Sequence, residues 1–175
     1  ASKRITQMLV IEVSRSLNTE LETVSTPIEE TEGCKLEDKL TIVPIIRAGI
    51  SMVEPTLEIL PQAVVGYIGL ERDEKTAISR SYYRKVPSLK GRKAFIVDPM
   101  LATGGSTLKA IDVCIEEGAA EITVISIISA PEGIKAVEEK HPAINVYTAS
   151  LDRELSSQKY ILPGLGDFGD RLYNT

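Results

Sequence analysis

The amino-acid sequence predicts an α/β protein in which a mostly parallel sheet of five strands is flanked by helices. The first observation is that short apolar runs rich in branched residues alternate with segments of helical periodicity, which is typical of βαβ units. The second is the composition, since 43% of the 175 residues are hydrophobic and 26% are charged, as in globular domains. The third is the absence of any compositional shift or repeat, so we expect a single domain over residues 1–175.

The elements follow in order along the chain. An opening helix is predicted from apolar residues at three- and four-residue steps, namely Ile5, Met8, Leu9, Val13 and Leu17. Thr26-Pro27 then interrupts the chain, and residues 31–33 are typical of a turn. Strands are predicted over the apolar runs 40–46, 63–70, 93–97, 122–128 and 145–149. Helices are predicted over 51–60, 106–117 and 131–140, with Gly118 closing the second and Pro131 opening the third.

Residues 71–90 do not fit this alternation. They are polar and charged, they include Tyr82 and Tyr83, and they are many for a connection in a compact domain. We therefore expect a projecting loop or a two-stranded arm that acts either as an active-site cover or as a subunit contact. The two tyrosines suit both roles.

The composition disfavours several classes of protein. The formal net charge of −5 argues against nucleic-acid binding, although local arginines and helix ends still hold small anions. Cys34 and Cys114 lack metal-ligand spacing and read as reduced thiols of a cytoplasmic protein. No apolar run approaches the length of a membrane span, and no signal peptide is visible.

The main chemical signal is the loop at residues 98–107, between a predicted strand and a predicted helix. Ligands of open α/β sheets bind outside the carboxyl ends of the strands. Adjacent glycines, the hydroxyls of Thr103, Ser106 and Thr107, and the free N–H groups of a helix start suit a phosphate. The alternative is a simple N-cap, with Ser106 or Thr103 starting the helix and nothing bound. Asp98 at the strand end favours the phosphate interpretation.

Other polar residues have two interpretations each. Arg47 follows a predicted strand and suits a pyrophosphate clamp, and the alternative is a surface salt bridge. Three cations of the segment 71–90 either fold over the same anion or stay solvated: Arg80, Arg84 and Lys85. His141 ends a predicted helix, where a cation facing the helix dipole is favoured over a general base.

Four stretches together resemble the type I phosphoribosyltransferases, and the uracil phosphoribosyltransferase family in particular. In chain order they are PIIRAG at 44–49, VDPMLATGGST at 97–107, APEG at 130–133 and ILPGLGDFGDR at 161–171. The resemblance covers essentially the whole chain. It implies the type I phosphoribosyltransferase fold with a projecting arm and a C-terminal base-binding hood. It also implies pyrimidine salvage by pentosyl transfer, in which uracil and phosphoribosyl pyrophosphate (PRPP) give UMP and diphosphate.

The resemblance assigns residues to each substrate. PRPP takes the loop, two arginines and one acid of the tail: Arg47, Arg72, Asp98, Pro99, Met100, Leu101, Ala102, Thr103, Gly104, Gly105, Ser106 and Asp167. Uracil takes four residues of the tail: Ile161, Gly166, Asp167 and Phe168. The candidate catalytic residues are Arg47, Asp98 and Asp167, and His141 has no matching role.

The glycine-rich tail also matches the dinucleotide fingerprint G-x-G-x-x-G, but too few residues follow it for the helix and acid which that motif needs. We expect backbone groups of Ile161 and Gly166 to match uracil, which presents two carbonyls with an N–H between them. Cytosine reverses part of this pattern, at a cost of roughly 1–3 kcal/mol for each buried group left unpaired. Many family members have Ala in place of Phe168, so we expect the backbone contact to persist and the pocket shape to differ.

The loop departs from most type I members, because Pro99 replaces the second of two adjacent acids, as in the uracil branch. We therefore expect no protein metal ligand. Mg²⁺ should enter on the pyrophosphate of PRPP, and Asp98 should hold the ribose hydroxyls.

Two alternatives remain: a phosphoribosyltransferase for another base, and a non-catalytic PRPP-sensing regulator. The tail disfavours the first. The net charge and single-domain length disfavour the second, which should show a basic surface or an added domain. The resemblance further implies a cytoplasmic homo-oligomer, a dimer or a tetramer, with GTP regulating some members. Members also carry a few dozen residues before the opening helix, which we expect to be absent here.

Overall fold

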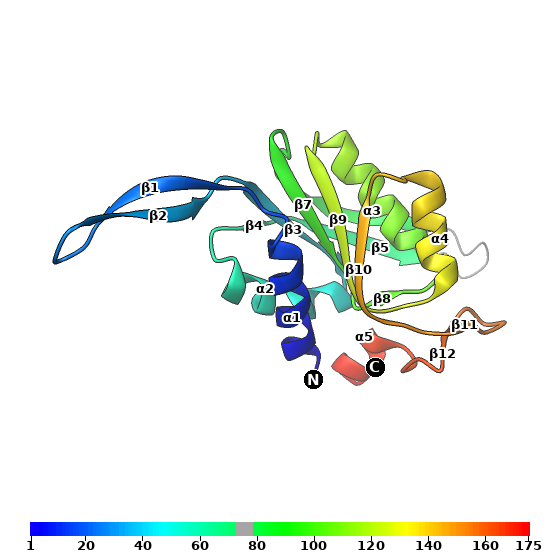
Figure 1. Ribbon diagram of the computed structural model, residues 1–175. Helices are drawn as coiled ribbons and strands as arrows, with labels where there is room; N and C mark the ends of the chain where they lie inside the picture. Colours follow the sequence, from blue (N-terminus) through cyan, green and yellow to red (C-terminus); the bar gives the residue numbers. More distant parts are fainter. Residues whose placement is uncertain (73–78) are drawn as a thin grey trace.

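A computed structural model describes residues 1–72 and 79–175, which form an α/β fold around a twisted central sheet (Figure 1). Within these residues the sheet follows the path β10-β9-β7-β3-β5-β6, with β4 beside β3 and β8 beside β9. The strands are β3 (Lys39–Ile46), β4 (Val64–Val65), β5 (Tyr67–Arg72), β6 (Ser79–Lys85), β7 (Arg92–Val97), β8 (Met100–Leu101), β9 (Glu121–Ser129) and β10 (Asn145–Leu151).

The five predicted strands form the parallel part of this sheet, which confirms the predicted fold class. The predicted strand 63–70 is divided at Gly66 into β4 and β5, both parallel to β3. Strand β6 pairs antiparallel with β5, so part of the segment 71–90 is a two-stranded element joined to the sheet edge.

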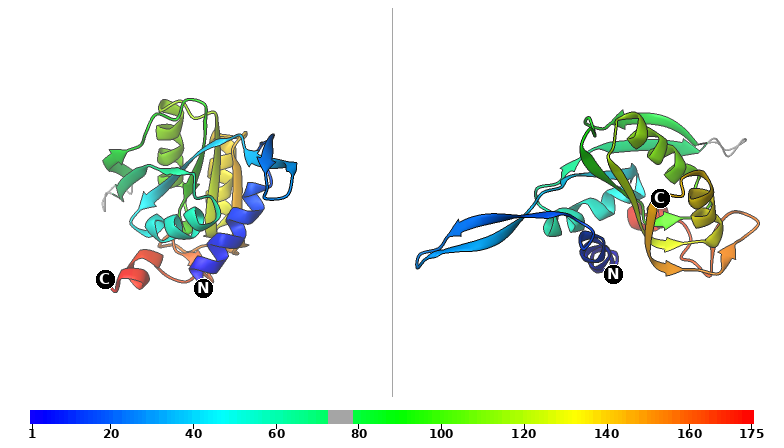
Figure 2. Two further views of the ribbon diagram at one scale, coloured as in Figure 1. Left: turned by 90° about the vertical axis from the view of Figure 1, so that its left-hand side faces the viewer. Right: turned by 45° about the horizontal axis from the view of Figure 1, so that its top comes forward.

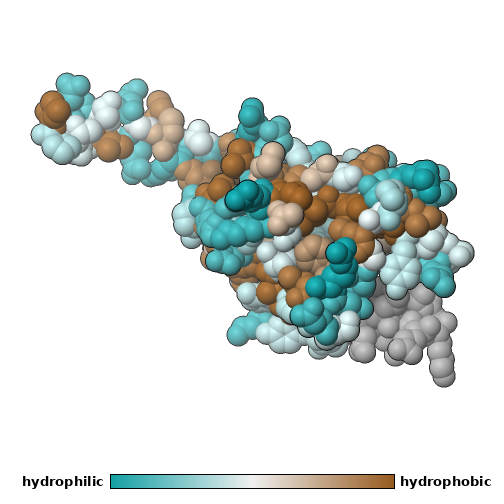
Figure 3. All heavy atoms as spheres, turned by 90° about the horizontal axis from the view of Figure 1, so that it is seen from below, coloured by the Kyte–Doolittle hydropathy of each residue, from teal (hydrophilic) through white to brown (hydrophobic). Residues whose placement is uncertain are grey.

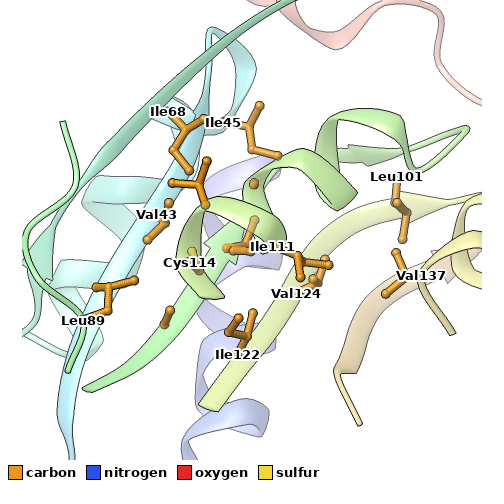
Figure 4. Packing of buried hydrophobic residues seen from close by; sticks show 14 residues of the cluster. Val43, Ile45, Ile68, Leu89, Leu101, Ile111, Cys114, Ile122, Val124 and Val137 are labelled. Atoms are coloured by element: carbon orange, nitrogen blue, oxygen red, sulfur yellow. The ribbon is translucent and has the colours of Figure 1, made fainter. Parts of the chain in front are cut away.

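Two hydrophobic clusters cover the two faces, because successive strand residues point to opposite sides. On one face, α3 (Gly105–Glu116) and α4 (Pro131–Lys140) pack on the sheet, with Ile111 and Cys114 of α3 in one cluster with Val43 and Val124 of the sheet (Figure 4). On the other face, α1 (Ser2–Ser14) packs with a 3₁₀ turn (Ala48–Met52) that leads into α2 (Val53–Ile59). The alternation assigns Ala94 and Ile96 of β7 to the first cluster, and Phe95 and Val97 to the second.

A long hairpin leaves the body between α1 and β3 (Figures 1 and 2). It is built from β1 (Thr19–Ser25) and β2 (Glu30–Leu36), paired antiparallel throughout. The prediction of a turn at 31–33 was therefore wrong, because those residues lie within β2, while Thr26 and Pro27 lie between the two strands. Every residue of β1 is exposed, so no buried face marks it as a strand in the sequence.

The C-terminal segment crosses beneath the carboxyl ends of the strands (Figure 1). It contains a small hairpin of β11 (Glu154–Leu155) and β12 (Ile161–Leu162), followed by α5 (Phe168–Tyr173). We call residues 152–175 the hood. Among residues 1–72 and 79–175, no helix has the length and apolar character to span a bilayer.

Candidate functional site

The strand order creates a switch point between β3 and β7. From β3 the chain moves to β5 on one side and then to β7 on the other, and ligands of such sheets bind where the order reverses. Arg47 follows β3 and Asp98 follows β7, so these two predicted site residues lie at the ends of the adjacent strands that form the switch point. Gly49 keeps the two strand ends together, because a Cβ atom there would lie only 2.5 Å from the Val97 carbonyl oxygen.

The loop after Asp98 is fixed to the end of β9 by backbone hydrogen bonds. The Pro99 carbonyl accepts from the N–H groups of Ile127 and Ile128 at 3.1 and 3.0 Å, and the Leu101 carbonyl accepts from Ala130 at 2.9 Å. The carbonyl of residue 99 needs no N–H of its own to bond, so proline is compatible with this course. The loop therefore reaches α3 along a defined path.

The helix α3 begins without a side-chain cap. Its N-cap is Gly104, which has a left-handed conformation at φ 82° and no side chain to accept from the first turn. The N-cap residue is therefore Gly104 rather than Ser106 or Thr103, and the Thr103 hydroxyl accepts from the N–H of Gly105 at 3.5 Å. The positive end of the helix dipole points into the loop, which suits a phosphate.

Helix α4 closes over the same loop through Gly133. A Cβ atom at Gly133 would lie 2.4 Å from the Ala102 carbonyl oxygen and 2.9 Å from that of Leu101. Gly104 also faces α4, since its Cβ would lie 3.1 Å from the Gly133 carbonyl oxygen. Backbone thus packs on backbone, which leaves no space for a side chain between loop and helix.

Asp98 is half-buried at the base of the site. Burial raises the pKa of this carboxyl to about 7. The hydrogen bond from the N–H of Met100 lowers this pKa, and the negative charge of Asp167 raises it further. Asp98 belongs to the switch point and Asp167 to the hood. Two carboxyl groups from distant parts of the chain therefore share one electrostatic environment.

The hood packs directly on the loop. Ile161 is 2% exposed and lies in one cluster with Ile128 and Ala130, against which Met100 and Ala102 also pack. Gly164 has a φ of +57° and its N–H donates to the Asp152 carboxylate at 2.9 Å. The N–H of Leu155 donates to Glu132 of α4 at 2.9 Å, a bond that lowers the pKa of Glu132.

The helix α5 brings the hood to Arg47. Asp167 is the N-cap of α5, where its carboxylate accepts from the N–H of Asp170 at 2.9 Å. The Asp170 carboxylate lies 2.9 Å from Nη2 of Arg47, and the ring of Tyr173 lies 5.9 Å from the guanidinium. The loop after Asp98, Arg47 and the hood turn that follows Ile161 therefore lie at the same end of the sheet.

Comparison with known proteins identifies this arrangement. The profile of the family described as uracil phosphoribosyltransferase matches residues 1–175. The chain is 51% identical over 99% of its length to the uracil phosphoribosyltransferase of Fervidobacterium nodosum, covering 84% of that protein. It is 49% identical over 98% to that of Levilactobacillus brevis, covering 83%.

The chain belongs to the uracil phosphoribosyltransferase family.

Solved structures agree with the family fold. A protein of Aquifex aeolicus superposes with a TM-score of 0.94 at 39% identity, covering 98% of this chain and 83% of the other. A purine phosphoribosyltransferase of Pyrococcus horikoshii superposes with a TM-score of 0.62 at 14% identity, covering 86% and 82%. At 14% identity the second structure shows similarity of fold alone. Together the two superpositions confirm the predicted type I phosphoribosyltransferase fold.

In this uracil phosphoribosyltransferase family member, several predicted site residues from distant parts of the chain lie together. Ile161 packs with Met100 and Ala102 of the loop, and Asp167 acts electrostatically on Asp98. Arg47 contacts Asp170 in the helix that Asp167 caps. Gly166 has a φ of +78° with open space where a Cβ would lie. The side chain of Phe168 packs against the cluster that contains Val10 and Met52, on the α1 side. The side chain of Arg72 lies outside the described residues.

Other candidates lie elsewhere. Arg84 contacts Glu116 and Glu117 at 2.6 Å each, at the end of α3 opposite the loop. His141 is the C-cap of α4, with its Nε2 3.5 Å from Asp112, which agrees with a helix-end role.

Several supporting residues could not be recognised from the sequence. Gly133 lies in the APEG stretch at 130–133, and its close approach to the Ala102 carbonyl oxygen explains why glycine is needed there. Asp152, Glu132 and Asp170 act on backbone or side chains far away in the sequence, so no spacing pattern marks them.

Proposed function

We propose that this protein is a uracil phosphoribosyltransferase that converts uracil and PRPP into UMP and diphosphate, for pyrimidine salvage. The observation that carries this proposal is the shared cluster of Ile161 with Met100 and Ala102, because it brings the turn that would read the base beside the loop that would hold the phosphate. A sugar held by the loop would then present its C1′ atom to a base held by the hood.

Each part of the site has a role in the proposal. The backbone of residues 99–106 and the start of α3 hold the 5′-phosphate, and the Asp98 carboxylate accepts from the ribose hydroxyls. Arg47 and Arg72 bind the pyrophosphate. Backbone groups of Ile161 and Gly166 read the uracil edge, with Asp167 and Phe168 beside them.

A magnesium ion fits this site as part of the substrate. Asp98 of the switch point and Asp167 of the hood offer two carboxyls, and the described residues hold no cluster of three or more metal-binding side chains. When bound, Mg²⁺ on the pyrophosphate would neutralise charge as this group leaves. The chain's own contribution is to fix the phosphate and hold the base.

In the reaction, N1 of uracil forms a bond to C1′ while the bond from C1′ to pyrophosphate breaks, and the pyrophosphate leaves with the electron pair. The N1 proton must be released. Asp167, exposed at the start of α5, is the candidate acceptor. Positioning and charge stabilisation supply the catalysis, with no covalent protein intermediate. Asp167→Asn with nearly unchanged turnover would remove Asp167 from this role.

The test is incubation of the protein with PRPP, Mg²⁺ and labelled uracil, cytosine, hypoxanthine or orotate. We expect UMP from uracil alone. A product from another base would establish a different phosphoribosyltransferase, and PRPP binding without any product would establish the sensor. GTP is added in a parallel series, and an unchanged rate would exclude its role as an activator.

We also propose that the protein is a cytoplasmic homo-oligomer, a dimer or a tetramer, in which the β1–β2 hairpin lies on a second copy. The hairpin exposes 70% of Leu21 and 92% of Ile28, and Figure 3 shows hydrophobic residues along it. A two-stranded hairpin is marginal alone, so cover by another subunit would stabilise it.

Cys34 provides a direct test of this contact. It pairs with Leu21 across the hairpin and therefore shares its face, while Cys114 is buried with a pKa raised to about 12. We expect alkylation of Cys34 to slow as protein concentration rises, in step with a dimer or larger species in sedimentation. A monomer at all concentrations, with constant Cys34 reactivity, would overturn the proposal.

A further inference from the structure

Three residues of α5 and its end lie around Arg47: Asp170, Tyr173 and Thr175. Nη2 of Arg47 lies 2.9 Å from Oδ1 of Asp170, and Nη1 donates to the Thr175 hydroxyl at 3.3 Å. The Thr175 hydroxyl in turn donates to Oδ1 of Asp170 at 3.1 Å. Tyr173 adds its ring and a hydroxyl 3.5 Å from the Arg47 carbonyl oxygen.

This contact contributes little to the stability of the fold. The side chains of Arg47 and Asp170 are 52% and 49% exposed, and ion pairs of such exposure contribute little to folding. A guanidinium has five N–H donors, so the two that Asp170 and Thr175 engage leave others for a ligand. The arrangement therefore orders a long side chain and keeps it able to bind an anion.

We propose that Asp170 is a positioning residue that holds Arg47 ready for the pyrophosphate of PRPP, which rests on the proposed function. Fixing a flexible side chain before binding removes an entropic cost from the binding step. The neighbouring Arg171 supports the other part of the hood, because its Nη1 donates to the Leu165 carbonyl in the turn that would read the base, at 2.9 Å. Two consecutive residues of α5 thus support the two halves of the site.

The test compares KM values for the two substrates. We expect Asp170→Ala to raise KM for PRPP about tenfold and to leave KM for uracil within about twofold. Asp170→Asn keeps an acceptor oxygen and should stay within about threefold of the wild type. Arg171→Ala is the matched control and should raise KM for uracil instead. In an Arg47→Ala background, Asp170→Ala should have no further effect on PRPP, as expected for residues that act through one another.

An unchanged or lowered KM for PRPP in Asp170→Ala would overturn the proposal, and so would a full effect that persists without Arg47. If Asp170→Ala does not fold, Thr175→Val is tested in its place. It removes the second contact to Arg47 without changing charge, and it should raise KM for PRPP by a smaller factor. A wild-type protein that forms no UMP would instead refute the proposed function. In that case calorimetric binding of PRPP to wild type and Asp170→Ala still decides the role of Asp170.

Discussion

Gly133 in the first turn of α4 lies directly against the carbonyl oxygen of Ala102 in the loop that follows β7. A Cβ atom at this glycine would stand 2.4 Å from that oxygen, which no real side chain permits. The path of the loop and the position of α4 are therefore determined together, through backbone on both sides.

Gly133→Ala should move the loop and weaken PRPP binding. The added methyl forces the backbone of residues 101–102 away from α4, and overpacking of this kind destabilises by about 1–3 kcal/mol. We expect KM for PRPP to rise at least about tenfold, measured by steady-state kinetics, together with a lower thermal midpoint. Glu138→Ala, exposed on the same helix, is the control and should change neither. Normal KM for PRPP in the Gly133 variant would show that the loop tolerates the shift.

Asp98→Asn should raise stability while it abolishes activity. Burial raises the folded-state pKa of Asp98 to about 7 from 3.8, so the folded protein binds more protons than the unfolded chain between these pH values. The free energy of unfolding therefore falls as pH rises through this window. Asparagine is neutral throughout, so the variant should exceed wild type at pH 8 by at most roughly 4 kcal/mol, with the difference vanishing near pH 4.

The control variant is Asp112→Asn, for which the expected change in stability at pH 8 has the opposite sign. Burial opposes ionisation of Asp112, but Lys140 at 2.8 Å outweighs it and lowers the pKa of this carboxyl. Asp112→Asn should therefore be less stable than wild type at pH 8. Denaturant unfolding at several pH values measures both variants, and equal behaviour of the two would contradict the assignment of Asp98.

The parallel sheet and its switch point could be predicted because burial leaves a strong pattern. Strands such as β3 and β9 are covered on both faces and read as continuous apolar runs. Asp98 and Arg47 could also be found, since each directly follows such a run. The position of the loop at residues 98–107, and its resemblance to a known family, can therefore be recognised from the local sequence.

The β1–β2 hairpin, helix α5 and the contact of Arg47 with Asp170 could not be predicted, because they depend on contacts between distant residues or lack a periodic pattern. The hairpin of β1 and β2 has no buried face, so it shows no alternation by which to recognise it. Helix α5 has six residues in a glycine-rich tail, too few for a periodic signal. The bond between Arg47 and Asp170 joins residues 123 positions apart, and only the folded chain brings them together.

Lys93→Met should destabilise the junction between the body and the hairpin. Nζ of Lys93 lies 3.0 Å from both Asp38 and Glu121, and the side chains of Lys93 and Asp38 are 14% and 13% exposed. Asp38 also accepts the N–H of Asn18 at 2.6 Å, so one carboxylate ties both ends of the hairpin. Loss of one partner costs about 3–5 kcal/mol in a fully buried pair and less in this partly exposed one. We expect a lower free energy of unfolding and faster hydrogen exchange at Asn18 and Glu37.

The same pair predicts a pH dependence. Burial opposes ionisation of Asp38, but the Asn18 N–H and the Lys93 ammonium together lower its pKa. A lowered pKa contributes stability that is present above the ordinary value of 3.8 and is lost as pH falls below it. The difference between wild type and Lys93→Met should therefore shrink on acidification. Lys135→Met, which breaks an exposed pair with Glu139, should change stability by less than about 0.5 kcal/mol at any pH.

Asp152→Ala should weaken uracil binding and leave PRPP binding unchanged. Its Oδ2 accepts from the N–H of Gly164, so this carboxylate anchors the turn that follows Ile161. The turn is tight, because a Cβ atom at Gly164 would lie 2.0 Å from the Ile161 carbonyl oxygen. Without it the turn loses its anchor, and the backbone groups that face the base lose their fixed positions. We expect KM for uracil to rise about fivefold to tenfold. Asp152→Asn retains an acceptor and should lose less, while Glu154→Ala, exposed on β11, should match wild type. An equal rise in KM for both substrates would mean that Asp152 supports the whole hood, because the PRPP site would then depend on it as well.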